Sequence, residues 1–358
     1  MYPGKVLVSD VDWGFIVEEP SPELSFLLLL TSDMYKKPKL QHPKRVDLNS
    51  FVRLASENKI LHYALTKVIE DNCLGMKSGA RDLLVRLKKN EDRKLLKLQK
   101  TIEALDEILE GEEYLLLNTY KYYPYVTHDV DIVVKDLRRV KKLMRSAGFT
   151  FIAEHQYPRM PGIQYRKEDL LVADISERIA WGSISVMDNE LLWEEDRKVA
   201  IGDVEVRLPS IEGELLYIIA HMNFQFYKIT LFDMFLIYRW ATMANWALMS
   251  MQANKYGWFG AFYDTISILN GFHRTLYDEP CPMEKVIPSV AQTQIQLPYI
   301  PSCSHVVRAL MEKGLLNLVK FPSYLLDRLE KTSYGLHRAY LKVILSYGNR
   351  FWVKCGHY

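Results

Sequence analysis

The chain has 358 residues, of which 49% are hydrophobic and 25% are charged. This composition is typical of a globular protein and excludes disordered and fibrous chains. The formal net charge is +2, which neither predicts nor excludes nucleic-acid binding, so any basic binding site must be local. The length predicts one substantial domain with helical additions, or two domains.

The cysteines and the amino terminus indicate a cytoplasmic protein. The cysteines are scattered, without C-x-x-C or metal-ligand spacing, which predicts free thiols in a reducing compartment. Residues 1–15 lack the basic-then-apolar order of a signal peptide. The apolar run 26–30 is too short to span a bilayer, and the longer apolar region 215–249 carries charged residues typical of buried helices. We therefore expect no membrane contact.

The first part of the chain divides into two segments. Residues 1–46 contain short apolar runs that predict strand or edge elements, followed by an exposed basic linker with prolines. Asp10 and Asp12 resemble the opening of haloacid dehalogenase phosphatases, but the Gly-Thr that follows there is absent. Residues 47–110 have apolar residues at helical spacing, which predicts two or three amphipathic helices.

The segment 111–208 changes to strand periodicity. Apolar runs at 113–118 and 129–135 predict strands, and Asp136 predicts the N-cap of a helix directly after them. Later runs predict further strands, including a hairpin that turns at Gly202.

The segment 209–358 is mostly helical in pattern, with Ser210 as the first N-cap. The order of elements is therefore helices, strands with a helix, and helices again. This order predicts an α+β fold in which a small mixed β-sheet core is flanked by helical regions on both sides.

The stretch "THDVDIVV" (127–134) sets two acids at the start of an apolar strand. Residues i and i+2 of a strand point to the same side, so Asp129 and Asp131 would project together, with Cα atoms about 6.6 Å apart. Such carboxylates repel each other and raise each other's pKa unless a cation neutralises them. Mg²⁺ suits this pair, because it takes one or two carboxylates, water and substrate phosphates. The alternative is an exposed strand start with solvated acids.

A third acid lies in a later strand. In the run 170–181, Ala173 and Ile175 share one face while Asp174 points the other way. If this strand neighbours the first, Asp174 would lie beside the acid pair. Two-metal transfer of phosphoryl or nucleotidyl groups commonly uses such a further carboxylate.

The motifs Asp-Val-Asp-Ile at 129–132 and Ala-Asp-Ile at 173–175 resemble the nucleotidyltransferase superfamily, which is related to DNA polymerase β. The wider layout, with helices before the core and "IIAHMN" and "FDMFLIYRW" after it, is similar to the uncharacterised branch labelled nucleotidyltransferase family 5. The resemblance covers about residues 48–245.

The resemblance implies Mg²⁺-dependent transfer of a nucleoside monophosphate from an NTP to a hydroxyl. Asp129 and Asp131 would hold two Mg²⁺ ions, and Asp174 would complete the site that activates the hydroxyl. A small molecule, a protein side chain and an RNA end all remain open as acceptors.

One motif departs from the superfamily. Where the superfamily has Gly-Ser, and this branch commonly Lys-Gly, the chain has Asn118-Thr119. These residues offer an amide and a hydroxyl, but not the close backbone approach to phosphates that glycine permits. Lys121 and the neighbouring tyrosines would add charge and stacking, so Asn118, Thr119 and Lys121 are the expected nucleotide-binding residues. The alternative is an inactive protein of this fold that senses a nucleotide or binds a partner.

Other polar residues have two interpretations. His221 and Asp233 lie where the family also has a His and an Asp, and either could face the cleft, but the sequence favours a core histidine and a helix-capping or paired aspartate. His128 is predicted to lie in a loop. The basic stretch 85–100 is predicted to form a solvated helix face. The alternative is a surface that docks nucleic acid.

Overall fold

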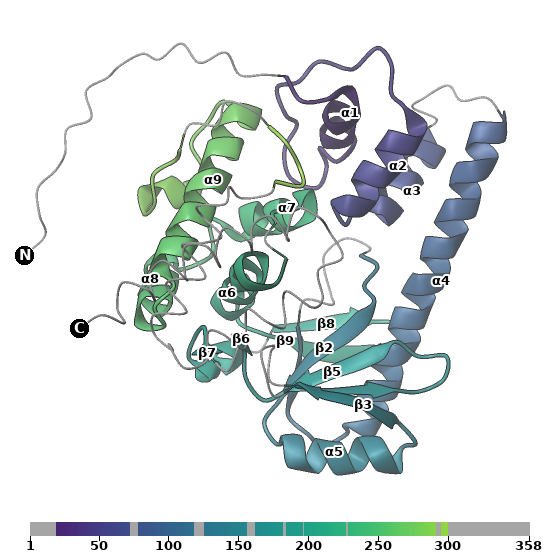
Figure 1. The fold of residues 1–358 in the computed structure, drawn as a ribbon, viewed down its shortest axis with the longest axis vertical. Helices are drawn as coiled ribbons and strands as arrows, with labels where there is room; N and C mark the ends of the chain where they lie inside the picture. Colours follow the sequence, from purple (N-terminus) through teal and green to yellow (C-terminus); the bar gives the residue numbers. More distant parts are fainter. Residues whose placement is uncertain are drawn as a thin grey trace, which may run out of the picture.

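The computed structural model describes residues 19–71, 78–117, 125–155, 162–181, 184–195, 197–226, 228–290 and 295–299. The helices before the sheet are α1 (Pro22–Leu30), α2 (Leu48–Glu57), α3 (Leu61–Asp71) and α4 (Ser78–Ile108). The last three confirm the helices predicted over 47–110. In Figure 1, the long α4 runs along one side of the molecule, from the N-terminal helices down to the sheet.

The predicted strand structure up to residue 30 is wrong for residues 22–30, which form α1. The run is buried almost throughout, and a short apolar run has no periodicity that separates a buried helix from a buried strand. The helix-start signals decide instead. Ser21 accepts a hydrogen bond from the N–H of Leu24 at 3.2 Å, and Pro22 occupies the first turn, where its missing N–H costs nothing.

The described residues contain a five-stranded mixed sheet in the order β1-β2-β5-β4-β3. Its strands are β1 (Tyr114–Leu117), β2 (Asp129–Val134), β3 (Thr150–His155), β4 (Gly162–Arg166) and β5 (Val172–Ser176), and α5 (Leu137–Ser146) connects β2 to β3. Strands β2 and β5 are parallel, whereas the other pairs are antiparallel. The α+β class predicted from the sequence is confirmed.

Smaller elements follow the sheet. They are β6 (Ala180–Trp181), β7 (Ile184–Ser185), η1 (Asn189–Trp193), β8 (Arg197–Ile201) and β9 (Val204–Leu208). Strands β8 and β9 form the predicted hairpin, and Gly202 in its turn has φ +60°, a conformation that glycine adopts without steric cost.

The helices after the sheet are α6 (Ile211–His221), the π-helical turn η2 (Met222–Phe226), α7 (Leu231–Trp240), α8 (Trp246–Lys255), α9 (Phe259–Tyr277) and the short η3 (Pro282–Lys285). The predicted N-cap is confirmed, because Ser210 accepts a hydrogen bond from the N–H of Gly213. Among the described residues, no helix combines the length and the hydropathy that crossing a bilayer needs.

The two faces of the sheet pack into different hydrophobic cores. On β2, Val130, Ile132 and Val134 join a core that includes residues of α4, α5 and β9. Val133 lies on the opposite face and joins a larger core, which combines the N-terminal helices with α6, α7 and α9. Because side chains alternate along a strand, Asp129 and Asp131 share the face of Val133, on the side of the C-terminal helices (Figure 1).

Candidate active site

Three acids meet on the face of the sheet that turns toward the C-terminal helices. The parallel register of β2 and β5 pairs the Cα of Asp131 with that of Asp174. Adjacent strands lie about 4.8 Å apart, so these two side chains are neighbours on one face. Asp129 lies one pleat away on that face, and all three acids are half-buried. The adjacency predicted from strand alternation is confirmed, whereas the chemical roles of the acids stay a prediction.

Neutral polar groups contact each of these carboxylates. Thr127 donates its hydroxyl to Asp129 Oδ1 at 3.2 Å, and the Gln164 amide donates to Asp174 Oδ2 at 3.0 Å. A Cβ atom added at Gly162 on β4 would lie 2.8 Å from Asp174 Oδ1. Gly162 therefore allows β4 to lie close against the third acid.

Tyr217 of α6 lies against the acids from the helical side. Its phenol donates a long hydrogen bond of 3.5 Å to Asp131 Oδ2, and the side chain is buried. Burial raises the pKa of Tyr217 far above its usual range, and the negative charges of Asp131, Asp129 and Asp174 raise it further. The phenol therefore stays protonated and can donate to a carboxylate. The sequence did not single out Tyr217, which lies within a continuous apolar helical run.

Tyr125 connects the acid pair to α7. Its ring stacks on Phe232, with ring centroids 4.8 Å apart and an interplanar angle of 23°. Burial raises the pKa of Tyr125, followed by the charges of Asp233, Asp129 and Asp131. The negative charges of Asp233 and of the acid pair therefore both act on the Tyr125 phenol.

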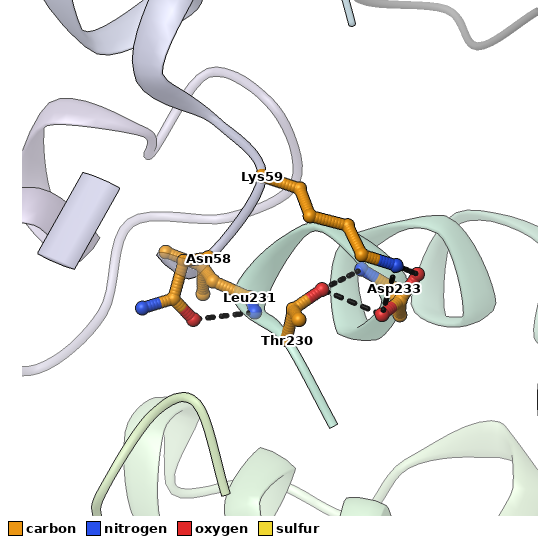
Figure 2. Close-up of polar contacts among 5 residues, drawn as sticks. All are labelled: Asn58, Lys59, Thr230, Leu231 and Asp233. Carbon is orange, nitrogen blue, oxygen red and sulfur yellow. Dashed lines mark hydrogen bonds and ion pairs between the residues drawn. The ribbon is translucent and has the colours of Figure 1, made fainter. Parts of the chain in front are cut away.

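Asp233 is a paired aspartate in the first turn of α7, as one interpretation of the sequence predicts, whereas the helix cap is Thr230. It accepts a hydrogen bond from the Thr230 hydroxyl at 2.6 Å, and its two oxygens lie 3.3 Å from the Lys59 ammonium (Figure 2). His221 is buried, and its ring stacks on Tyr217 at 5.5 Å. His128 lies on an exposed bend, as predicted.

Comparison with known proteins agrees with this geometry. Residues 127–272 match the family model described as "Uncharacterised nucleotidyltransferase". This stretch is nucleotidyltransferase-like. The family resemblance predicted from the sequence is thereby confirmed, although the match begins at residue 127 and the predicted resemblance at residue 48. The matched stretch contains Asp129, Asp131 and Asp174.

One solved structure matches part of the chain. The antibiotic-resistance factor ANT(2'')-Ia is 13% identical and has a TM-score of 0.33, and the match covers 49% of this chain and 96% of that one. No match was found among the curated proteins.

The acids of the nucleotidyltransferase-like segment (127–272) are the residues predicted to hold Mg²⁺. Among the described residues, no group of three or more His, Cys, Asp or Glu side chains is arranged to hold a metal ion. Carboxylate oxygens are nevertheless the donors that Mg²⁺ prefers, and Mg²⁺ usually binds through one or two carboxylates together with water and substrate phosphates. Asp129 and Asp131 fit that requirement, while Asp174 as a further ligand stays a prediction.

The expected nucleotide-binding residues are not described by the structure. Asn118, Thr119 and Lys121 lie in the segment 118–124, outside the described residues. Their roles therefore stay predictions.

Proposed function

We propose that this chain transfers a nucleoside monophosphate from an NTP to a hydroxyl group of an acceptor. The observation that carries the proposal is the register of β2 with β5, which sets Asp131 beside Asp174 within a nucleotidyltransferase-like segment. In such a reaction the acceptor oxygen bonds to the α-phosphorus, the bond from that phosphorus to the β-phosphate oxygen breaks, and pyrophosphate leaves.

Each acid has a role in this proposal. Asp129 and Asp131 would hold two Mg²⁺ ions, which supply positive charge next to the phosphate oxygens. Asp174 would act at the acceptor hydroxyl, whose proton must leave as the new bond forms. Tyr217 would position Asp131 through the hydrogen bond of its phenol. The acceptor is a small molecule, a protein side chain or an RNA end.

The test is incubation of the full chain with each α-³²P-labelled NTP, Mg²⁺ and a cell extract. We expect a labelled product, and we expect Asp131→Asn to reduce labelling at least about 100-fold, because the amide removes the charge that a divalent cation needs. Labelling that Asp131→Asn leaves undiminished would contradict the proposal.

The matched control for this substitution is Asp169→Asn. Asp169 is exposed in the turn before β5 and has φ +62°, a left-handed conformation in which asparagine is well tolerated. The control makes the same chemical change outside the acid cluster, so we expect it to label at the wild-type rate.

A second function is favoured by one sequence feature. Asn118-Thr119 stands where the superfamily has Gly-Ser, and neither residue allows the close backbone approach that glycine permits. A protein that binds a nucleotide without transferring it would give heat in calorimetric titration with Mg²⁺ and NTP, but no labelled product with any extract. The enzyme would give both.

A further inference from the structure

The basic stretch 85–100 lies in the middle of α4, and five of its cations share one face of the helix. They follow one another three or four residues apart, form what we call the α4 cation row, and are Arg86, Lys89, Arg93, Lys97 and Lys100. Residues at this spacing lie on one side of a helix, and the row spans about 21 Å along the axis. Four of the five residues are exposed, and Lys97 is half-buried. The exposed acids Asp82 and Glu107 lie beyond the two ends of the row.

The opposite face of α4 is buried, so the row points away from the body of the molecule. Leu84 joins the larger hydrophobic core, and Leu98 and Leu105 join the core on the sheet. These leucines differ by multiples of seven residues, about two helical turns, which keeps them on one side of the helix. Among the described large apolar residues of α4, Leu83 and Leu96 are exposed. Two such residues do not make the apolar face by which an amphipathic helix lies in a membrane.

The acids within the same stretch pair with lysines outside the row. Glu91 pairs with Lys94 at 2.6 Å, and Asp92 pairs with Lys88 at 3.0 Å. Each of these lysines directly adjoins a residue of the row in the sequence and is therefore rotated about 100° from it. The ion pairs of the stretch thus leave the charges of the row available to a partner.

A second helix with a cationic outer face packs on the same face of the sheet. α5 has five lysines and arginines among its ten residues, and no acid. Its buried residues join the same core as the C-terminal half of α4. Three exposed cations lie on the outer face of α5, and they are Arg138, Lys142 and Arg145. In Figure 1, both helices lie on the outside of the molecule, α4 along one side and α5 at the lower end.

This concentration of positive charge is local. Residues 86–100 and α5 together hold twelve lysines and arginines and two acids, while the whole chain has a formal net charge of +2. The rest of the chain is therefore net negative. A polyanion would be attracted to these two helices rather than to the molecule as a whole.

We propose that the α4 cation row and the outer face of α5 bind the phosphate backbone of double-stranded RNA. Regularly spaced cations along a helix suit the regularly spaced phosphates of a nucleic-acid strand. A duplex fits better than a single strand, because the row has no aromatic side chain on which an unpaired base could stack. Protein partners usually bind around buried aromatic or apolar anchors, whereas charged side chains form this row.

The inference goes beyond the proposed function. Binding of a phosphate backbone does not depend on nucleotidyl transfer, but the choice of RNA over DNA rests on the proposed function, in which an RNA end is one of the acceptors. The C-terminal half of α4 and α5 cover the sheet face opposite to the acids. The surface would therefore hold the body of the RNA rather than its reacting end.

The first test is binding of a fluorescein-labelled RNA duplex to the full chain, measured by fluorescence anisotropy over a range of KCl concentrations. The α4 variant carries Lys89→Gln, Lys97→Gln and Lys100→Gln, because glutamine removes the charge and favours a helix about as well as lysine. We expect it to weaken binding at least about tenfold. The dependence of log K on log salt should become shallower by about two to three, because each lost phosphate contact removes close to one from that slope.

The matched control carries Lys37→Gln, Lys44→Gln and Lys285→Gln, which replace exposed lysines outside α4 and α5. It changes the net charge by the same amount, so we expect it to bind the duplex as the wild type does. Equal affinity and an equal salt slope in the α4 variant and this control would overturn the proposal.

A third variant measures the contribution of α5. Its changes are Arg138→Gln, Lys142→Gln and Arg145→Gln, all at exposed positions. We expect a loss of affinity of the same order as in the α4 variant, because each substitution removes a cation that faces away from the sheet. Wild-type affinity here would overturn the assignment of α5 to the surface.

Other polyanions test the identity of the partner. The wild type and the α4 variant are titrated with a DNA duplex of the same sequence, with poly-glutamate and with phosphatidylserine vesicles. We expect the RNA duplex to bind most tightly at equal ionic strength. Tighter lysine-dependent binding of any other polyanion would overturn the assignment to RNA.

The labelling experiment separates this inference from the proposed function. Lysine-dependent binding of the RNA duplex without a labelled product from any NTP would contradict nucleotidyl transfer and leave this inference standing. A labelled product, together with wild-type RNA affinity in the α4 variant, would do the reverse.

Discussion

At the scale of single residues, Gly162 lies in close contact with the side chain of Asp174 and with the backbone of β5. A Cβ atom there would lie 2.8 Å from Asp174 Oδ1 and 3.0 Å from the carbonyl oxygen of Ile175. We expect Gly162→Ala to lower the free energy of unfolding by about 1–3 kcal/mol, since the backbone oxygen cannot move as a side chain can. Urea denaturation measures this, and labelled transfer should fall with it as Asp174 is displaced.

The control for this prediction is Gly79→Ala. Gly79 lies in α4, where an added Cβ would have no atom within 4 Å. Alanine favours a helix by about 1 kcal/mol relative to glycine, so we expect this variant to be at least as stable as the wild type. An equal stability of both alanine variants would contradict the contact with Asp174.

The residues of the site differ in how far the sequence predicts them. Asp129 and Asp131 follow from strand alternation, because a period of two fixes which side chains share a face. Asp174 lies beside them because β5 pairs with β2, which alternation alone does not fix. Tyr217 and Gln164 do not follow, since their contacts join β2 to α6 and β5 to β4. Such contacts depend on how elements pack, and no local pattern encodes that packing.

At the scale of elements, the junction between α2 and α7 depends on one amide side chain. Asn58 is fully buried, and its side-chain oxygen Oδ1 accepts a hydrogen bond from the N–H of Leu231 at 2.8 Å. Replacement by alanine would leave that N–H buried without this acceptor, and we expect the free energy of unfolding to fall by about 1–3 kcal/mol. Urea denaturation followed by circular dichroism measures the change.

The exposed counterpart of this contact is Asn245, the N-cap of α8, which accepts the N–H of Leu248 at 3.0 Å. Water can replace the acceptor there, so Asn245→Ala should cost about 1 kcal/mol or less. If Asn58→Ala costs no more than Asn245→Ala, the junction contributes little to stability.

Elements with clear start signals or clear alternation were predicted correctly, including α6 from Ser210 and the hairpin at Gly202. The strand predicted at α1 is wrong although Ser21 and Pro22 are helix-start signals. Its apolar run is buried on all sides, so burial removed the periodicity that would identify a helix. No local sequence pattern predicts that α1 packs into the same core as α7 and α9.

At the scale of the whole molecule, a histidine joins the N-terminal and C-terminal parts of the chain. His273 of α9 is fully buried among Tyr35, Tyr238 and Tyr277. Its Nδ1 lies 3.0 Å from the carbonyl oxygen of Glu279, so Nδ1 is the donor. Nε2 lies 3.0 Å from the Tyr35 hydroxyl and accepts a hydrogen bond from it, which requires a neutral imidazole.

The charges around His273 act in both directions, and burial outweighs them. Burial lowers the pKa of His273, and Lys36 lowers it further, whereas the Glu279 carbonyl and the carboxylates of Glu279 and Glu284 raise it. The carboxylate oxygen Glu279 Oε1 lies 4.0 Å from Nε2. The buried thiol of Cys281 has a raised pKa and stays neutral. The folded state therefore binds a proton at His273 less readily than the unfolded chain does.

This difference predicts that acid weakens the fold at near-neutral pH. The unfolded histidine takes up a proton as the pH falls below about 6.5, while the folded histidine stays neutral until its lower pKa is reached. The contribution of His273 to stability is thus complete above about pH 6.5 and is lost at up to about 1.4 kcal/mol per pH unit below it. Urea denaturation of the wild type and of His273→Gln at pH 7.5 and pH 5.5 tests this, because the other histidines are common to both proteins. We expect the variant to be less stable at pH 7.5 and the difference to shrink at pH 5.5; a constant difference would mean that His273 has the same pKa folded and unfolded.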